Sequence, residues 1–135
     1  MSKIKKINHV AIVVENIEES LKFWRDQLGL TLDHIEDLPS QSSMVAFLPV
    51  GEGEVELVQP TDMESGLAKY LAKRGEGMHH LCVEVEDIDG ILADLKAKGV
   101  RLIDEVAKEL PGRRLAFIHP KASNGVLIEL YEILD

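Results

Sequence analysis

The sequence contains two copies of one pattern, and this duplication limits the fold more than any other feature. Asn8–Val14 reads N-H-V-A-I-V-V and leads into Glu-Asn-Ile, while His79–Val85 reads H-H-L-C-V-E-V and leads into Glu-Asp-Ile. His9 and His80 hold equivalent places in the two copies, 71 positions apart. Apolar and polar residues alternate over residues 78–85, which is typical of a strand with two different faces. We therefore expect two similar modules, with the chemistry where the modules face each other.

Both copies continue with the same order of elements. We expect strands over residues 7–14, 30–38, 44–48, 54–58, 78–85, 100–106, 115–119 and 126–133. A connector over residues 61–77, helical over 64–74, joins module 1 (about 5–60) to module 2 (about 78–133) within a single domain, 1–135. The fold class predicted is α+β, in which two tandem β-α-β-β-β modules form one eight-stranded curved mixed sheet.

One helix is expected in each module, directly after its first strand. Asn16 and Asp87 can cap these helices, and Gly29 and Gly99 are well placed to end them in a left-handed conformation. The apolar stripe of the first helix consists of Ile17, Leu21, Trp24 and Leu28, and that of the second consists of Ile88, Ile91, Leu92 and Leu95. We expect a turn over residues 110–114, before the seventh strand.

Charge and composition exclude several classes of function. The net charge of −9 argues against non-specific nucleic-acid binding, which depends on neutralising phosphates. No apolar run approaches the ~20 residues that cross a bilayer, and no signal peptide is recognisable, so we expect no membrane partner. A single cysteine fits a reducing compartment, and the expected location is cytoplasmic.

Two histidines and two carboxylates occupy matching strand positions in the modules. His9 and His80 lie on the first strands, and Glu56 and Glu129, 73 positions apart, lie on the last strands. Each of these residues alone could be an ordinary structural or solvent-facing side chain. Recurrence at equivalent places favours a divalent-metal site that leaves coordination positions open for a substrate.

The chain resembles the vicinal oxygen chelate (glyoxalase-like) superfamily and, within it, the family of methylmalonyl-CoA epimerases. The resemblance covers nearly the whole chain. It rests on N-H-V-A-I-V-V, E-L-V-Q-P, G-M-H-H-L-C-V-E-V, K-G-V-R-L-I-D-E and A-F-I-H-P-K-A-S-N-G-V-L-I-E-L. The doubled histidine and the H-P-K stretch are more specific than the superfamily pattern.

The resemblance implies an enzyme that interconverts (2R)- and (2S)-methylmalonyl-CoA by 1,1-proton transfer through a metal-stabilised enolate. It places the metal ligands at His9, Glu56, His80 and Glu129, the positions that the duplication also selects. Glu129 is the first candidate for a catalytic base, and Glu56 is the symmetric candidate on the opposite face. The cofactor is a divalent ion, with Co, Mn, Zn, Ni and Mg all compatible with mixed nitrogen and oxygen ligands.

Two departures from the family pattern affect the substrate contacts. The loop before the A-F-I-H-P-K stretch reads E-L-P-G-R-R, where relatives are often rich in glycine. Residues 45–47 on the third strand read V-A-F, where some relatives carry a glutamate. Coenzyme A needs cations for its phosphates, and the candidates are Arg113, Arg114 and Lys121, although each could equally be a plain surface charge.

Three other functions are compatible with the same scaffold. A lactoylglutathione lyase of the glyoxalase I type shares the metal site and the proton transfer. A ring-cleaving dioxygenase commonly uses two histidines and one carboxylate around iron. A binding or resistance protein would sequester a ligand without a metal. We also expect a homodimer, although the apolar helix stripes could be satisfied within one chain.

Overall fold

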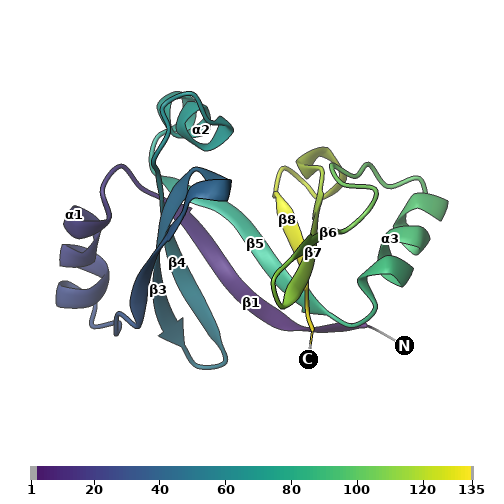
Figure 1. The fold of residues 1–135 in the computed structure, drawn as a ribbon, viewed down its shortest axis with the longest axis horizontal. Helices are drawn as coiled ribbons and strands as arrows, with labels where there is room; N and C mark the ends of the chain where they lie inside the picture. The colour runs from purple at the N-terminus through teal and green to yellow at the C-terminus, as the bar shows by residue number, and fades with distance from the viewer. Residues whose placement is uncertain (1–2, 135) are drawn as a thin grey trace. The chain divides into compact units, whose positions relative to one another are not determined.

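The computed structural model of the chain describes residues 3–134, and Figure 1 shows its elements. Within this range the eight strands are β1 (Ile4–Val13), β2 (His34–Leu38), β3 (Ser43–Val50), β4 (Gly53–Pro60), β5 (Gly77–Val85), β6 (Lys108–Leu110), β7 (Arg113–Ile118) and β8 (Ile128–Ile133). The α-helices are α1 (Ile17–Leu21), α2 (Gly66–Arg74) and α3 (Ile88–Ala97). Short helical turns are the π-helical η1 (Lys22–Gln27) and the 3₁₀ segments η2 (Pro39–Gln41) and η3 (Pro120–Ala122). The repeated β-α-β-β-β order is confirmed.

The strands of residues 3–134 hydrogen-bond in the order β2-β3-β4-β1-β5-β8-β7-β6. β5 and β8 run parallel, whereas β2–β3, β3–β4, β6–β7 and β7–β8 are antiparallel. In both copies the first strand neighbours the fourth, which neighbours the third, which neighbours the second. The mixed α+β fold class predicted from the duplication is confirmed.

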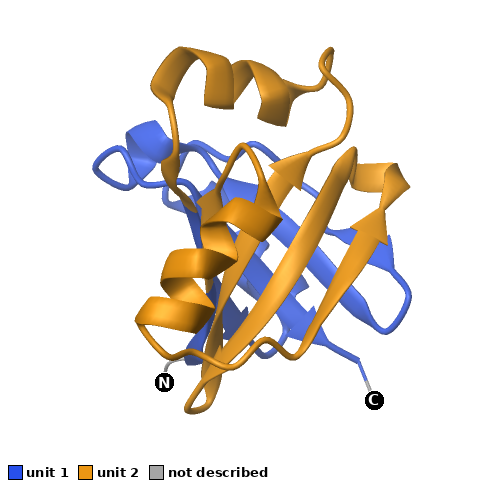
Figure 2. Ribbon diagram, turned by 90° about the vertical axis from the view of Figure 1, so that its left-hand side faces the viewer, with its two compact units in different colours: residues 1–9, 80–135 blue, residues 10–79 orange. Residues whose placement is uncertain are grey.

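The chain forms two compact units that divide strands β1 and β5 between them. Unit 1 contains residues 1–9 and 80–135, and unit 2 contains residues 10–79 (Figure 2). Each unit packs one helix on its strands. In unit 2, Ile17 and Leu21 of α1 pack with Ala46, Leu48 and Leu57. In unit 1, Ile88 and Leu92 of α3 pack with Val85, Ala107, Ala116 and Leu130. The same helix-on-sheet core is thus built twice.

The helices begin where the sequence predicts. The Asn16 side chain accepts a hydrogen bond from the Glu19 amide at 2.9 Å, and the Asp87 side chain accepts one from the Gly90 amide at 3.1 Å. Gly29 and Gly99 lie two residues after the last helical residues, with φ of +97° and +75°, a region that favours glycine. α2 begins after Ser65, whose hydroxyl caps the Ala68 amide.

The prediction of a strand over residues 100–106 is wrong. The strand β6 forms later in the chain. Leu102 makes only an isolated bridge with Ile118. The Asp104 carboxylate accepts a hydrogen bond of 2.9 Å from the Phe117 amide. In a continuing strand, this amide would donate to a backbone carbonyl instead. Part of the segment expected as a turn is instead strand: Lys108–Leu110 and Arg113–Ile118 pair across a turn at Pro111 and Gly112.

The first helix changes its winding part-way along. Lys22–Gln27 is π-helical, and the Leu28 amide donates to the Phe23 carbonyl five residues earlier at 2.7 Å. A π-turn adds residues per turn and rotates the next residues of the helix out of the 3.6-residue register. Leu28 is therefore 53% exposed, although its spacing from Leu21 predicts a place on the apolar stripe.

No helix within residues 3–134 combines the length and the apolar character that crossing a membrane requires.

The π-helical segment gives a matched test of core packing. Leu21 is fully buried and Leu28 is half exposed, so Leu21→Ala should cost about 2–5 kcal/mol of unfolding free energy. Leu28→Ala, the control, should change it by less than about 1 kcal/mol. Urea unfolding followed by circular dichroism measures both. Equal losses would mean that the π-turn does not move Leu28 off the core.

Candidate metal centre

Three strands of unit 1 bring His9, His80 and Glu129 together. His9 lies on β1, His80 on β5 and Glu129 on β8. The distance between His9 Nε2 and His80 Nε2 is 3.2 Å. Glu129 Oε1 lies 3.4 Å from His9 Nε2 and 3.1 Å from His80 Nε2. Of the four residues predicted as ligands, these three form one triangle of donor atoms.

The triangle has the dimensions of a coordination site. Donor atoms that bind one ion at about 2.1 Å lie roughly 3.0–3.4 Å apart for octahedral or tetrahedral angles. Imidazole nitrogens and a carboxylate oxygen are ligands that suit divalent transition metals. His9 and Glu129 are 5% and 6% exposed, so water cannot easily screen the group. The residues therefore fit a divalent ion without large rearrangement.

Asn8 orients the imidazole ring of His9. Glu84 carries a carboxylate, which accepts hydrogen bonds, so the Asn8 amide nitrogen donates to Glu84 Oε1 at 3.1 Å. This leaves Asn8 Oδ1 facing His9 Nδ1 at 2.8 Å. Nδ1 then donates a hydrogen bond to Asn8 Oδ1, which directs Nε2 towards His80 and Glu129. A partner of this kind is common behind metal-binding histidines, where it orients the ring.

Lys5 contacts Glu84, the residue that binds the Asn8 amide. Its Nζ lies 3.5 Å from Glu84 Oε2, and Glu84 is buried. The ion pair with Lys5 holds the Glu84 carboxylate in place, and the hydrogen bond to Glu84 holds the orientation of the Asn8 amide. Lys5, Glu84 and Asn8 therefore position the imidazole of His9 without joining the donor triangle.

The histidines set the charge of Glu129. Burial alone would raise the pKa of its carboxyl, but hydrogen bonds to His80 and His9, and their charge, lower the pKa to about 2. Glu129 is therefore ionised at neutral pH, as a metal ligand must be.

Glu56 occupies in unit 2 the place that Glu129 occupies in unit 1. Glu129 pairs across the strands with Phe117, and Glu56 pairs in the same way with Phe47. Glu56 is half-buried on β4. The two glutamates therefore hold equivalent positions in the two copies of the pattern. The role of Glu56 as a fourth metal ligand stays a prediction. Val45, on the third strand, is buried in the core with Ala11 and Val58.

The predicted substrate-binding cations differ in their surroundings. Arg114 makes hydrogen bonds of 2.7 and 2.9 Å to the Asp89 carboxylate, and Glu132 lies 4.0 Å away. The bond to Asp89 raises the pKa of Arg114 and lowers that of Asp89. Arg114 thus ties β7 to α3, and its positive charge is already paired with a carboxylate. Arg113, half-buried at the start of β7, and Lys121, exposed in η3, stay predictions as phosphate contacts.

The sequence pattern does not identify Asn8 or Glu84 as part of the site. Asn8 precedes His9 and looks like a strand end, and Glu84 looks like one more polar residue in the alternation. The available signal was the N-H dipeptide near the start of the first repeat together with a carboxylate on the His80 face of β5. Cys82 shares that face of the strand.

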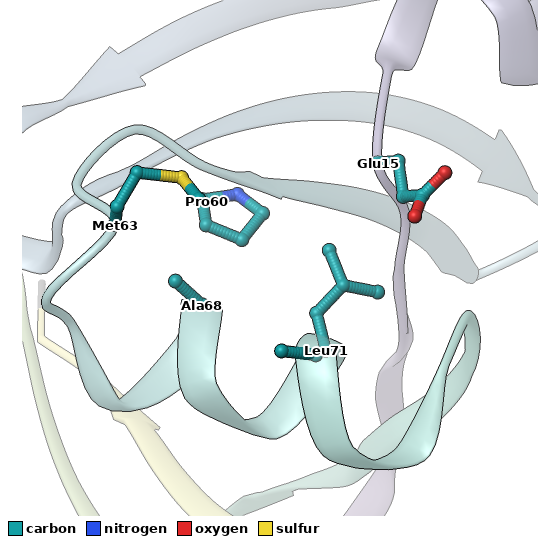
Figure 3. A pocket seen from close by; sticks show the side chains of 6 residues that line it. Glu15, Pro60, Met63, Ala68 and Leu71 are labelled. Atoms are coloured by element: carbon teal, nitrogen blue, oxygen red, sulfur yellow. The ribbon is translucent and has the colours of Figure 1, made fainter.

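A separate pocket of about 280 Å³ lies within unit 2. Its lining residues are Glu15, Pro60, Met63, Ala68, Leu71 and Ala72. Figure 3 shows Leu71 and Ala68 projecting from α2, with the Glu15 carboxylate at one side. One carboxylate among apolar side chains is not a metal-ligand set, so this pocket is not the candidate metal centre.

The family comparison agrees with this geometry. The family model described as the Glyoxalase/Bleomycin resistance protein/Dioxygenase superfamily matches residues 8–117. The chain belongs to this superfamily. The matched range includes His9, Glu56 and His80, and it ends before Glu129.

Within the superfamily, the chain is similar to methylmalonyl-CoA epimerases. The mitochondrial methylmalonyl-CoA epimerase of Homo sapiens is 38% identical over 127 residues, which cover 93% of this chain and 72% of the human protein. The ethylmalonyl-CoA/methylmalonyl-CoA epimerase of Cereibacter sphaeroides is 34% identical, with coverage of 96% and 99%. A solved methylmalonyl-CoA epimerase in complex with methylmalonyl-CoA and NH4+ superposes with a TM-score of 0.86 at 32% identity, with coverage of 96% and 95%. The resemblance predicted from the motifs is confirmed.

The low pKa of Glu129 predicts how stability depends on pH in the metal-free protein. Because its folded-state pKa of about 2 lies below the ordinary 4.5, ionised Glu129 stabilises the fold above about pH 4.5. This contribution is lost as the pH falls towards 2. The difference in unfolding free energy between wild type and Glu129→Gln should therefore shrink across that interval.

Urea unfolding at a series of pH values, with chelator present, measures this difference. Glu105→Gln, at an exposed loop position, controls for the loss of one carboxylate. A wild-type advantage that stays constant or grows on acidification would contradict the assignment.

Proposed function

We propose that this chain is a methylmalonyl-CoA epimerase that interconverts the (2R) and (2S) forms of its substrate through an enolate. The main observation in support of this proposal is the triangle formed by His9 Nε2, His80 Nε2 and Glu129 Oε1, with sides of 3.1–3.4 Å. It lies in a chain whose similar relatives are named for this activity. We propose His9, His80 and Glu129 as metal ligands, with Glu56 as the fourth.

The chemical problem is to remove a weakly acidic proton from the carbon between a carboxylate and a thioester. A bound divalent ion would supply Lewis-acid stabilisation of the negative charge that develops on the substrate oxygens. The residues of the chain hold the substrate, exclude water and move the proton. A planar enolate has no stereochemistry at this carbon, so return of a proton to the opposite face inverts the centre.

Glu129 is the proposed base on one face. Its low pKa keeps it ionised and able to accept a proton at neutral pH. The same low pKa makes it a weak base, so its proximity to the reacting carbon must contribute more than its basicity. Glu56 is the proposed partner on the other face, since it holds in the first copy of the pattern the place that Glu129 holds in the second.

Recognition of the CoA part of the substrate requires local positive charge, because the protein as a whole carries −9. We assign this role to Arg113 and Lys121, whereas the guanidinium of Arg114 is already bound by Asp89. We further propose a homodimer in the cytoplasm and leave the choice among Co, Mn, Zn, Ni and Mg to direct metal analysis.

Hydrogen exchange at C2 tests the proposed function directly. Methylmalonyl-CoA in deuterated water should incorporate deuterium at C2 with metal-loaded protein, at a rate that matches turnover. Chelator-treated protein should lose this activity, and added metal should restore it. NMR measures the exchange, and the glutathione hemithioacetal of methylglyoxal is the comparison substrate. No exchange with any of the five metals, or turnover of the hemithioacetal alone, would refute the proposal.

The variant Glu129→Gln separates the two roles of this residue. Removing a base from the transition state typically costs about 100-fold or more in rate, whereas a neutral amide oxygen can still contact the ion. We expect C2 exchange at saturating metal to fall by about 100-fold or more and metal affinity by about tenfold. Isothermal titration calorimetry gives the affinity and NMR the rate. Parallel losses of both would make Glu129 a ligand only.

A further inference from the structure

Cys82 lies next to the donor triangle and is not used by the proposed mechanism. It is on β5, two residues after His80 and therefore on the same face of the strand. In the parallel pairing of β5 with β8, Cys82 is the direct register partner of Glu129. Two independent features of the sheet, the alternation along β5 and the register with β8, thus direct this thiol towards the triangle.

The atoms are close enough for a shared ion. Cys82 Sγ and one ligand atom each of His9 and Glu129 all lie within 4.8 Å of one another. All three residues are buried, and Cys82 is fully inaccessible. Sulfur binds such ions at about 2.3 Å and nitrogen or oxygen at about 2.1 Å, so donors on opposite sides of an ion are roughly 4.4 Å apart. The bound of 4.8 Å is close to this separation, so the thiol is a candidate donor to the same ion.

We infer that Cys82 is a thiolate ligand of the metal ion in the substrate-free protein. The inference rests on the metal centre of the proposed function and adds a sulfur donor to it. A thiol loses its proton when it binds such an ion, and the ion would supply the positive charge that a buried thiolate needs. The donor set in unit 1 then becomes two imidazoles, one carboxylate and one thiolate.

A sulfur donor changes which metals the site prefers. Thiolates favour Zn²⁺ and Co²⁺, while Mg²⁺ and Mn²⁺ favour oxygen ligands. The four histidine and carboxylate positions predicted from the sequence accept all of these ions. Cys82 would therefore be the residue that makes the site prefer Zn²⁺ or Co²⁺. The competing explanation for Cys82 is that it is a small buried residue that only fills space.

Cobalt spectroscopy tests the inference without relying on activity. Metal-free protein is titrated with Co²⁺ under anaerobic conditions, and the visible ligand-field bands report binding to any of the donors. A sulfur-to-cobalt charge-transfer band in the near ultraviolet reports the thiolate alone. We expect wild type to show both signals with the same stoichiometry. Cys82→Ser and Cys82→Ala should keep the visible bands and lose the charge-transfer band.

Metal affinities give a second measure that a packing role would not reproduce. Cys82→Ser should weaken Zn²⁺ binding by about tenfold or more and leave Mn²⁺ binding within about threefold. Cys82→Ala should show the same selective loss, with circular dichroism confirming that both variants are folded. Equal losses for the two metals would assign Cys82 to packing and overturn the inference.

The remaining outcomes separate this inference from the proposed function. Visible bands without a charge-transfer band in wild type, or no cobalt binding, overturn the thiolate ligand. C2 exchange on methylmalonyl-CoA by protein that lacks the charge-transfer band leaves the proposed function intact while the inference fails. A charge-transfer band that Cys82→Ser abolishes, in protein that catalyses no exchange, supports the sulfur ligand while the proposed function fails.

Discussion

The close approach of three electron-rich atoms governs the organisation of unit 1. His9 Nε2, His80 Nε2 and Glu129 Oε1 lie 3.1–3.4 Å apart, and His9 and Glu129 are almost completely buried. Hydrogen bonds and charge from His80 and His9 stabilise the buried carboxylate of Glu129, which would otherwise be costly to bury. The strands must hold the three side chains close enough for these contacts. The parallel β5–β8 pairing fixes Glu129 next to β5, and Asn8 holds the ring of His9.

The duplication in sequence does not coincide with the division into compact units. His9 belongs to the first copy of the pattern, yet it lies in unit 1 with His80 and Glu129 of the second copy. β1 therefore brings a histidine of one copy next to the strands of the other. Neither copy alone contains the donor triangle, which gives a physical reason for a chain of two joined copies.

The sequence was sufficient for the features that depend on local chemistry or on repetition. Alternation predicted the strand containing His80, and the side chains of Asn16 and Asp87 predicted where the helices begin. It failed where a tertiary contact overrides local pattern. Leu28 leaves the apolar stripe because of a π-turn, and Asp104 replaces a strand acceptor with its side chain. Neither effect has a signature in residue spacing.

The difference between repeated and unrepeated features also explains which candidate site residues the sequence identifies. Repetition identified His9, His80 and Glu129, because a residue type that recurs at equivalent places is visible without coordinates. Asn8 and Cys82 have no matching partner of their own type in the other copy: the residue before His80 is His79, and the residue two after His9 is Ala11. A duplicated fold reveals what both copies share. What distinguishes one metal centre from another on such a fold lies in the positions where the copies differ, and these require the register of the strands.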